Sequence, residues 1–189
     1  SPKPLPPALA FLPGIDVIRR DQAVFDDASI DLVLIFDCSD GVYLKTFLPT
    51  MKRRVPLVVF DHHVTNPRYG TINLIEPESA ATADVVWRFV KAVGWTINRH
   101  AAQCILTGIC TDTSAFSTTN TTSACLEAAH ELTKLGAKLQ EIVRHTMMSK
   151  SDEAMKLWGL ALSRLYQDTT FEAVAPGITR KDLKEAGAQ

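Results

Sequence analysis

The sequence predicts an α/β protein in which helices flank a parallel β-sheet and the second half of the chain is helical. Two apolar runs predict the sheet: Leu32–Phe36 and the segment 55–60, which are followed by Asp37 and Asp61. Unbroken Val, Ile and Leu are typical of strands covered on both faces, as in a parallel sheet. The segment 41–54 between the runs has the length and mixed polarity of a helix, so a right-handed β-α-β crossover is the simplest connection.

The two aspartates occupy equivalent places, because each one follows a predicted strand. Both therefore lie at the carboxyl ends of parallel strands, which is the edge where open α/β sheets bind ligands. A candidate site is expected at this edge.

The remaining chain carries mainly helical patterns after a short strand expected over 69–75. Ser79 is a candidate N-cap for a helix over 80–93, and Asn98 is one for a helix over 99–112. A further helix is expected to end near Gly136, and two more are expected over Leu139–Met147 and Asp152–Tyr166. Ser149 introduces the helix over Asp152–Tyr166. From Thr169 the sequence predicts a strand, a turn and the start of another helix.

The composition limits the class of protein. With 189 residues and 46% hydrophobic content, the chain can bury a core and reads as one domain, or one domain with a fragment of another. Its net charge of -1 gives no electrostatic basis for binding long duplex DNA or a membrane surface. Four cysteines without CxxC spacing, and no membrane-spanning run or signal peptide, predict reduced thiols and a cytoplasmic location.

The stretch VVFDHHVTN places Asp61, His62 and His63 side by side after a predicted strand. An isolated tripeptide of this kind could equally be chance or a capping turn. Asp37 at the equivalent end of the other strand instead suggests a shared cluster. Carboxylates with a minority of imidazoles suit Mn²⁺ or Mg²⁺ better than a structural zinc site, which favours thiolates.

A third polar segment follows the helix expected over 99–112. Asp112 ends that helix, and seven of the ten residues from Thr113 to Thr122 carry hydroxyl groups. Such a loop can offer hydroxyls and backbone N–H groups to phosphate oxygens. Alone, the acid would be read as an ordinary helix-end residue and the loop as an ordinary loop.

The segments IFDCSD, FDHHVTNPRYG and GICTDTSAFSTTNTT, in this order, resemble motifs two, three and four of the DHH phosphoesterase superfamily. The resemblance runs from about Phe11 to Tyr166 and is strongest to the branch of oligoribonucleases, 3′-phosphoadenosine-5′-phosphate phosphatases and cyclic-dinucleotide phosphodiesterases. It implies a Rossmann-like DHH domain over residues 1–167, and a linker with the start of a truncated C-terminal, DHHA1-like domain over 168–189. The family's first motif has no match before Asp37, so a fragment is the simplest interpretation.

The resemblance also implies roles for individual residues. Asp37 would bridge two Mn²⁺ ions, His62 and Asp112 would hold one of them, and His63 would face the scissile phosphate. Asp61 would orient the histidines or support the metal shell. The implied catalytic set is Asp37, Asp61 and His63, the metal set is Asp37, Asp61, His62 and Asp112, and the substrate-binding set is His63, Arg68, Ser114 and Asn120.

One departure from the family lies at Ser114, Ala115 and Ser117, where relatives often have Gly and Arg. Loss of that arginine would remove a phosphate contact, for which Arg68 and Lys45 are candidate substitutes.

The resulting hypothesis is a phosphoesterase that uses two Mn²⁺ ions, with Mg²⁺ as the alternative metal, to direct water at phosphorus. Its expected substrates are short oligoribonucleotides or adenosine phosphates such as pApA and pAp. A homodimer is compatible with the sequence. Two alternatives stay open: a manganese inorganic pyrophosphatase, and a non-catalytic module that binds metal or nucleotide.

Overall fold

The computed structural model describes residues 5–19, 21–40, 54–148, 151–170 and 172–187. The chain forms two compact units, Ser1–Met147 and Met148–Gln189. The predicted crossover helix over 41–54 lies, except for Arg54, outside the described residues. The second unit includes a helix that the sequence assigned to the first domain, and the predicted domain boundary after residue 167 stays a prediction.

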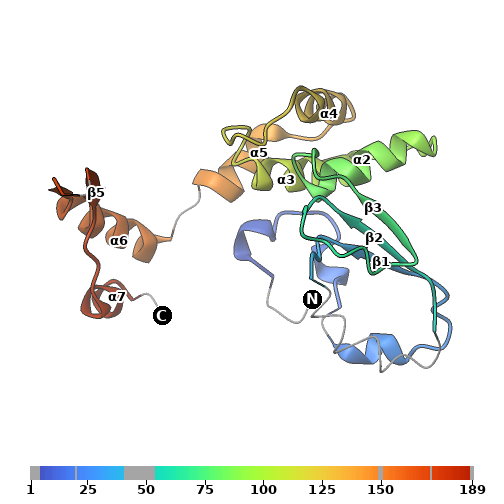
Figure 1. Ribbon diagram of the computed structural model, residues 1–189, viewed down its shortest axis with the longest axis horizontal. Coiled ribbons are helices and arrows are strands. Elements are labelled where there is room, and N and C mark those ends of the chain that lie inside the picture. The colour runs from blue at the N-terminus through green and yellow to red at the C-terminus, as the bar shows by residue number, and fades with distance from the viewer. Residues whose placement is uncertain (1–4, 20, 41–53, 149–150, 171, 188–189) are drawn as a thin grey trace. The chain divides into compact units, whose positions relative to one another are not determined.

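The first unit contains the predicted parallel sheet. Strands β1 (Val33–Phe36), β2 (Leu57–Asp61) and β3 (Ile72–Ile75) lie in the order β1-β2-β3, and both neighbouring pairs are parallel (Figure 1). Phe36 pairs with Phe60 in the register of the first pair. Asp37 and Asp61, the next residues, therefore reach the same edge of the sheet, as the sequence predicts.

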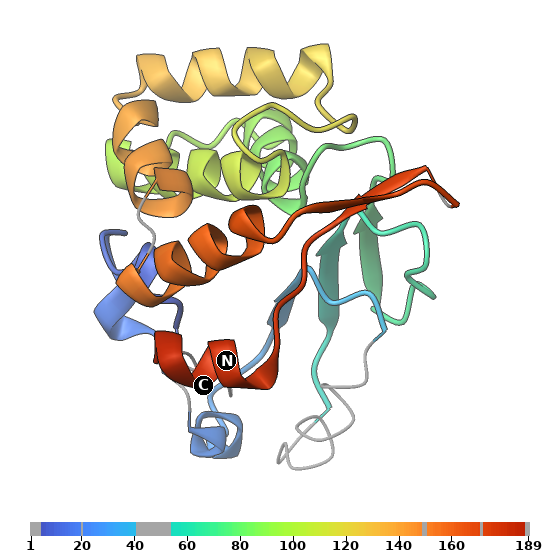
Figure 2. The same cartoon turned by 90° about the vertical axis from the view of Figure 1, so that its left-hand side faces the viewer.

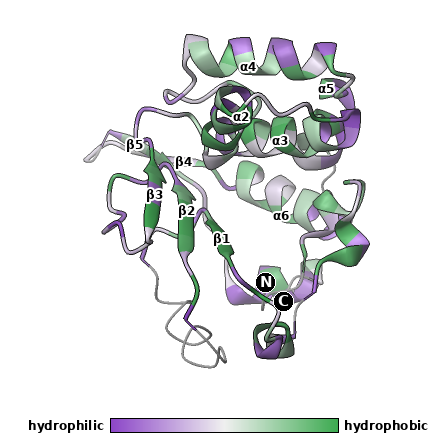
Figure 3. Cartoon of the chain, turned by 90° about the vertical axis from the view of Figure 1, so that its right-hand side faces the viewer, coloured by the Kyte–Doolittle hydropathy of each residue, from purple (hydrophilic) through white to green (hydrophobic). Residues whose placement is uncertain are grey.

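Burial differs between the two strands that carry the aspartates, although both are hydrophobic (Figure 3). In β2, Val59 and Phe60 are fully buried, as expected for a central strand. In β1, Leu34 and Phe36 are each 50% exposed. The prediction of cover on both faces therefore holds for β2 but not for β1, which is an edge strand among the described residues.

Helices form a layer beside this sheet (Figures 1 and 2). They are α2 (Thr82–Ala92), α3 (Arg99–Asp112), α4 (Ser123–Lys134) and α5 (Leu139–Val143), followed by a π-helical turn, Arg144–Met148. Their shared core contains Trp87, Leu106, Ile109, Leu132 and Ile142. The apolar stripes of these amphipathic helices face one another, which removes them from water.

The caps of these helices depart from the sequence prediction at one position. Asn98 caps α3 as predicted, because its side chain accepts hydrogen bonds from the N–H groups of His100 and Ala101. Ser79 does not cap the preceding helix, which begins after Ala81. The Ser79 hydroxyl instead accepts a hydrogen bond from the Arg88 guanidinium.

Helices α2 and α3 approach closely at Gly108. A Cβ atom placed there would lie 2.6 Å from the Cβ atom of Ala83, which is closer than two carbons can pack. We expect Gly108→Ala to push the helices apart and to lower the free energy of unfolding of the first unit by about 1–3 kcal/mol. Hydrogen–deuterium exchange in α2 and α3 would then become faster.

Gly159→Ala is the matched control, because no atom lies within 4 Å of a Cβ placed at that helical glycine. There the substitution is expected to slow hydrogen–deuterium exchange in the helix that contains residue 159, because alanine stabilises a helix by roughly 1 kcal/mol relative to glycine. If hydrogen–deuterium exchange in α2 and α3 is equally fast in Gly108→Ala and in the unchanged protein, the close approach of the two helices is refuted.

The amino-terminal segment of the first unit consists of short 3₁₀ turns at Pro7–Leu9, Ile15–Val17 and Gln22–Asp26. Phe11 packs against the helical core and stacks on the His145 ring, with 4.5 Å between the ring centroids. In the described residues, no helix combines the length and apolar character needed to cross a membrane.

The second unit contains α6 (Asp152–Ser163), the antiparallel strands β4 (Tyr166–Asp168) and β5 (Ala173–Ala175), and α7 (Arg180–Ala186). The strand and helix expected after Thr169 are thus confirmed. The preceding helix ends at Ser163 rather than Tyr166, and its cap is Ser151; Ser149 lies outside the described residues.

An ion pair joins two segments of this second unit. Arg164 donates two hydrogen bonds to the Asp182 carboxylate, at 2.6 and 3.0 Å. The same carboxylate completes a capping box with Thr179 at the start of α7.

Candidate metal centre

Asp37 begins the site at the end of β1. Its N–H donates to the Phe60 carbonyl at 3.0 Å, which continues the strand pairing by one residue. Its φ of 56° then turns the chain away from the sheet into the left-handed region, which aspartate tolerates better than most residues. The Thr82 hydroxyl donates to Asp37 Oδ1 at 2.7 Å and fixes the carboxylate at the sheet edge.

Asp61, the last residue of β2, is fully buried. Its Oδ1 accepts hydrogen bonds from the backbone N–H groups of His62 at 2.8 Å and His63 at 3.1 Å. Its Oδ2 accepts one from Asn66 Nδ2 at 2.6 Å. Burial opposes ionisation, but the bonds from Asn66, the His63 ring and these N–H groups outweigh it and lower the pKa of Asp61 below its usual value.

The His62 ring is oriented by a backbone carbonyl. Nδ1 lies 3.1 Å from the Ser79 carbonyl oxygen, which can only accept, so this nitrogen carries the proton. In the neutral ring Nε2 then carries the lone pair, 3.6 Å from Asp112 Oδ2 and 3.9 Å from Asp37 Oδ1. An unprotonated imidazole nitrogen beside two carboxylates is the donor that a metal ion needs.

His63 is held by the buried acid. Its Nδ1 lies 2.7 Å from Asp61 Oδ1 and 3.7 Å from Asp37 Oδ1. The hydrogen bond with Asp61 raises the pKa of the His63 imidazole, and the charges of Asp61, Asp37 and Asp112 add to this effect. Nearly half of the side chain stays exposed, so the ring can meet a molecule from solution.

Asp112 closes the group from the carboxyl end of α3. Partial burial raises the pKa of Asp112, and the negative charge of Asp37 raises it further. An Asp112 carboxylate that faces the negative charge of Asp37 is stabilised when a cation lies between the two.

The donor set fits a divalent metal ion. Asp37, His62 and His63 each offer one ligand atom, and these atoms all lie within 4.8 Å of one another. Asp112 adds a carboxylate oxygen at 3.6 Å from His62. Carboxylate oxygens with one or two imidazole nitrogens match the ligand preference of Mn²⁺ and tolerate Mg²⁺.

Sequence reasoning missed several residues that position this group. Thr82 and Asn66 bond the carboxylates directly, and the Ser79 carbonyl orients His62. Asn66 and Tyr69 also donate to the Cys38 carbonyl, which fixes the chain after Asp37. The only local signal was Asn66, because asparagine soon after a strand commonly forms such turn contacts.

The predicted substrate-binding residues other than His63 lie around the group without joining it. Ser114 and Arg68 have left-handed backbones, and in the described part of the chain neither has a hydrogen bond or ion pair to the cluster. Asn120 donates to the Ala80 carbonyl at 2.9 Å, which ties the hydroxyl-rich loop to the start of α2. Lys45 lies outside the described residues.

An apolar recess adjoins the carboxylates. It has a volume of about 440 Å³, and Asp37 and Asp112 form part of its wall. The remaining wall consists mainly of residues from β1, α2 and α3: Phe36, Thr82, Ala83, Val86, Cys104, Ile105, Gly108 and Thr111.

Comparison with known proteins gives relatives that bear on this site, although no protein-family model matches the chain. The bifunctional oligoribonuclease and PAP phosphatase NrnA of Thermus thermophilus is 36% identical over 107 residues, which cover 57% of this chain and 33% of that protein. The protein of the same name from Bacillus subtilis is 28% identical over 133 residues, which cover 67% of this chain and 39% of that protein. This chain thus spans well under half the length of either curated relative.

A solved structure extends the likeness to the fold. The exopolyphosphatase-related protein of Bacteroides fragilis superimposes with a TM-score of 0.89 at 21% identity, over 100% of this chain and 58% of that chain. These likenesses support the resemblance to the DHH phosphoesterase superfamily. The resemblance carried by the three motifs is thereby confirmed, together with the predicted α/β fold of the DHH type.

A second solved structure is more distant. The Methanococcus jannaschii protein assigned to the family II inorganic pyrophosphatases gives a TM-score of 0.52 at 15% identity, over 86% of this chain and 57% of that chain. This likeness concerns the fold alone.

Proposed function

We propose that this DHH chain carries the metal-binding part of a phosphoesterase that hydrolyses short oligoribonucleotides or adenosine phosphates with Mn²⁺. The observation that carries the proposal is the convergence of Asp37, His62 and His63 at the carboxyl ends of two parallel strands, with Asp112 beside them. Names of the relatives support the substrate class, because both are described as oligoribonuclease and PAP phosphatase.

Each residue of the cluster has a separate role in this proposal. Asp37, His62 and Asp112 would hold a divalent ion, while His63 would face the phosphate. When two such ions are bound, they activate water and neutralise charge that develops on the phosphoryl oxygens. Asp61 would act through His63, because its buried carboxylate holds the imidazole in one orientation and stabilises its protonated form.

Substrate size follows from charge. The net charge of -1 offers no broad basic surface for a long polyanion. A short substrate needs only local neutralisation, which the metal ligands and the exposed His63 can supply. Mono- and dinucleotides therefore fit better than long strands.

The direct test is release of AMP from pApA by the purified chain in Mn²⁺, with His62→Ala beside it. We expect turnover that depends on Mn²⁺. In His62→Ala we expect turnover to fall at least about 100-fold. His130→Ala is the matched control, since this histidine lies exposed on α4 away from the cluster, and its turnover should not change.

Pyrophosphate as a second substrate separates the competing hypotheses. Hydrolysis of pyrophosphate without hydrolysis of pApA would overturn the proposed substrate class and favour a pyrophosphatase. Tight binding of Mn²⁺ with no turnover of either substrate would favour a binding module.

A further inference from the structure

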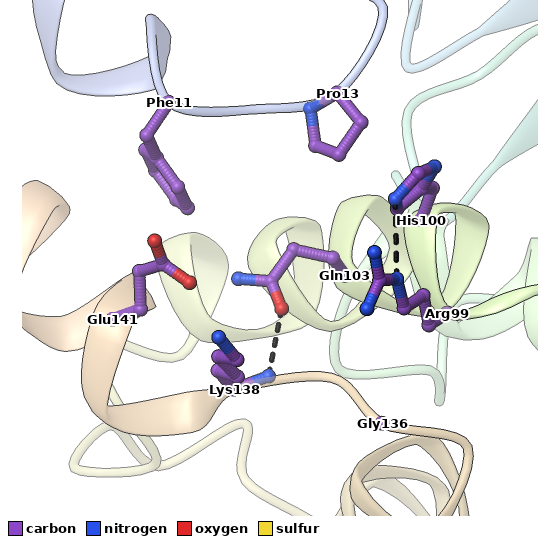
Figure 4. A pocket seen from close by; sticks show the side chains of 8 residues that line it. All are labelled: Phe11, Pro13, Arg99, His100, Gln103, Gly136, Lys138 and Glu141. Carbon is purple, nitrogen blue, oxygen red and sulfur yellow. Dashed lines mark hydrogen bonds between the residues drawn. The ribbon is translucent and has the colours of Figure 1, made fainter.

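A second cavity lies at the amino-terminal end of α3, whereas Asp112 lies at the carboxyl end of the same helix. At 1.5 Å per residue the two ends are roughly 20 Å apart, so this cavity is separate from the metal centre. Its volume is about 240 Å³. The amino-terminal segment, α3 and the start of α5 supply its wall (Figure 4): Phe11, Pro13, Arg99, His100, Gln103, Gly136, Lys138 and Glu141.

Gln103 points an unsatisfied donor into this cavity. Its Oε1 accepts a hydrogen bond from the Lys138 backbone N–H at 2.7 Å, which fixes the orientation of the amide. Nε2 therefore points the other way, toward the space between Phe11 and Glu141 (Figure 4). The side chain is only 7% exposed, and Nε2 has no hydrogen-bond partner in the part of the chain that the structure describes.

A buried donor without a partner lowers stability, so it favours any molecule that brings an acceptor. The charges of the wall indicate what kind of acceptor. Arg99 and Lys138 place two cations at the cavity, and the positive end of the α3 dipole lies there too. An oxyanion matches all three features.

The wall also has features for the remainder of a ligand. Glu141 is an acceptor for a donor group on the same molecule, and Phe11 gives an apolar surface. The volume lies just below the usual range of ligand pockets, about 300–1,000 Å³. The occupant is therefore no larger than a mononucleotide.

We propose that this cavity binds a small organic oxyanion, held by Gln103 Nε2, Arg99 and Lys138, at a site distinct from the metal centre. The proposal does not depend on the phosphoesterase function. The oxyanion can be a phosphate monoester or a carboxylate, which share this recognition chemistry.

Calorimetric titration of the intact chain, freed of metal by a chelating resin, distinguishes the two sources. The probes are AMP, inorganic phosphate and succinate, with adenosine as the uncharged control. If AMP or phosphate binds saturably and succinate does not bind, the cavity is a phosphate site. If succinate binds and neither AMP nor phosphate does, it is a carboxylate site. Adenosine is expected not to bind.

Two variants test the assigned contacts. Gln103→Glu keeps the oxygen that accepts from Lys138 N–H but replaces the free donor by a second oxygen with negative charge. Lys138→Met removes one cation and leaves the backbone donor in place. Each is expected to weaken binding at least about 10-fold. Lys134→Met is the matched control on the exposed end of α4 and should bind as the unchanged chain does.

Three results would overturn the proposal: no saturable binding of any charged probe, undiminished binding by both Gln103→Glu and Lys138→Met, or loss of binding in Asp37→Asn. The last result would place the anion at the metal centre instead. If Gln103→Glu fails to fold, Lys138→Met decides alone.

Discussion

Replacement of Asp37 by asparagine is expected to weaken Mn²⁺ binding by the chain at least about 100-fold. The carboxylate lies 3.9 Å from His62 Nε2 and 3.7 Å from His63 Nδ1, so it is an exposed acid close to both imidazoles. Asparagine keeps the shape and one acceptor oxygen, but it has no charge to offer a divalent cation.

The fold should survive this change for two reasons. Asn, like Asp, tolerates the left-handed φ of 56° at this position, and the carbonyl oxygen of the new amide can still accept from Thr82. The side chain is also 53% exposed, so no buried charge is lost.

Calorimetry with Mn²⁺ measures the affinity, and circular dichroism checks the fold. Asp31→Asn is the control, because it removes the same charge from an exposed residue before β1. Equal Mn²⁺ affinity of Asp37→Asn and the unchanged chain would rule out this aspartate as a ligand.

The sequence predicted those elements whose causes are local. The strand that ends on Asp61 was predicted because it is an uninterrupted apolar run, and its buried residues confirm this. Asn98 was identified as a cap because its bonds reach only two and three residues ahead. In both cases the determining atoms are close in sequence.

The predictions from sequence failed for residues whose bonding partners lie far away along the chain. Ser79 was the nearest capping residue before α2, but its carbonyl meets His62, which is 17 positions away in the sequence. Thr82 meets Asp37 across 45 positions. A capping rule considers only neighbours along the chain, so it could not anticipate that the sheet edge would use these groups.

The sequence predicts the candidate ligand residues of the site, but it does not predict the residues and backbone conformations that position them. Asp37, Asp61, His62 and His63 were identified from residue type and strand position alone. Three successive left-handed residues, Ser114 to Phe116, were not foreseen, because serine, alanine and phenylalanine give no local sign of positive φ.

The second large effect concerns the buried acid. We expect Asp61→Asn to lower the free energy of unfolding of the first unit by about 1–3 kcal/mol and to weaken Mn²⁺ binding roughly 10–100-fold. Oδ1 accepts from two backbone N–H groups and lies against the His63 ring, so the amide oxygen must take that side. The new amide nitrogen then faces Asn66 Nδ2, and two donors meet in a buried space.

The reciprocal substitution tests this reason. In the double variant Asp61→Asn, Asn66→Asp, the amide at position 61 again meets an acceptor, while the Arg68 N–H keeps an oxygen to bond. Recovery should be partial, because the bond from Asn66 to the Cys38 carbonyl is lost. The urea dependence of hydrogen exchange in β2 measures the free energy for each variant.

A double-mutant cycle then isolates the interaction between the two residues. A favourable coupling energy would mean that Asp61 acts through a matched donor and acceptor pair with Asn66. Additive losses would mean that burial of the negative charge beside the histidines is what matters. In the first case Mn²⁺ affinity should recover together with stability, because the orientation of His63 depends on the same carboxylate oxygen that the pair holds in place.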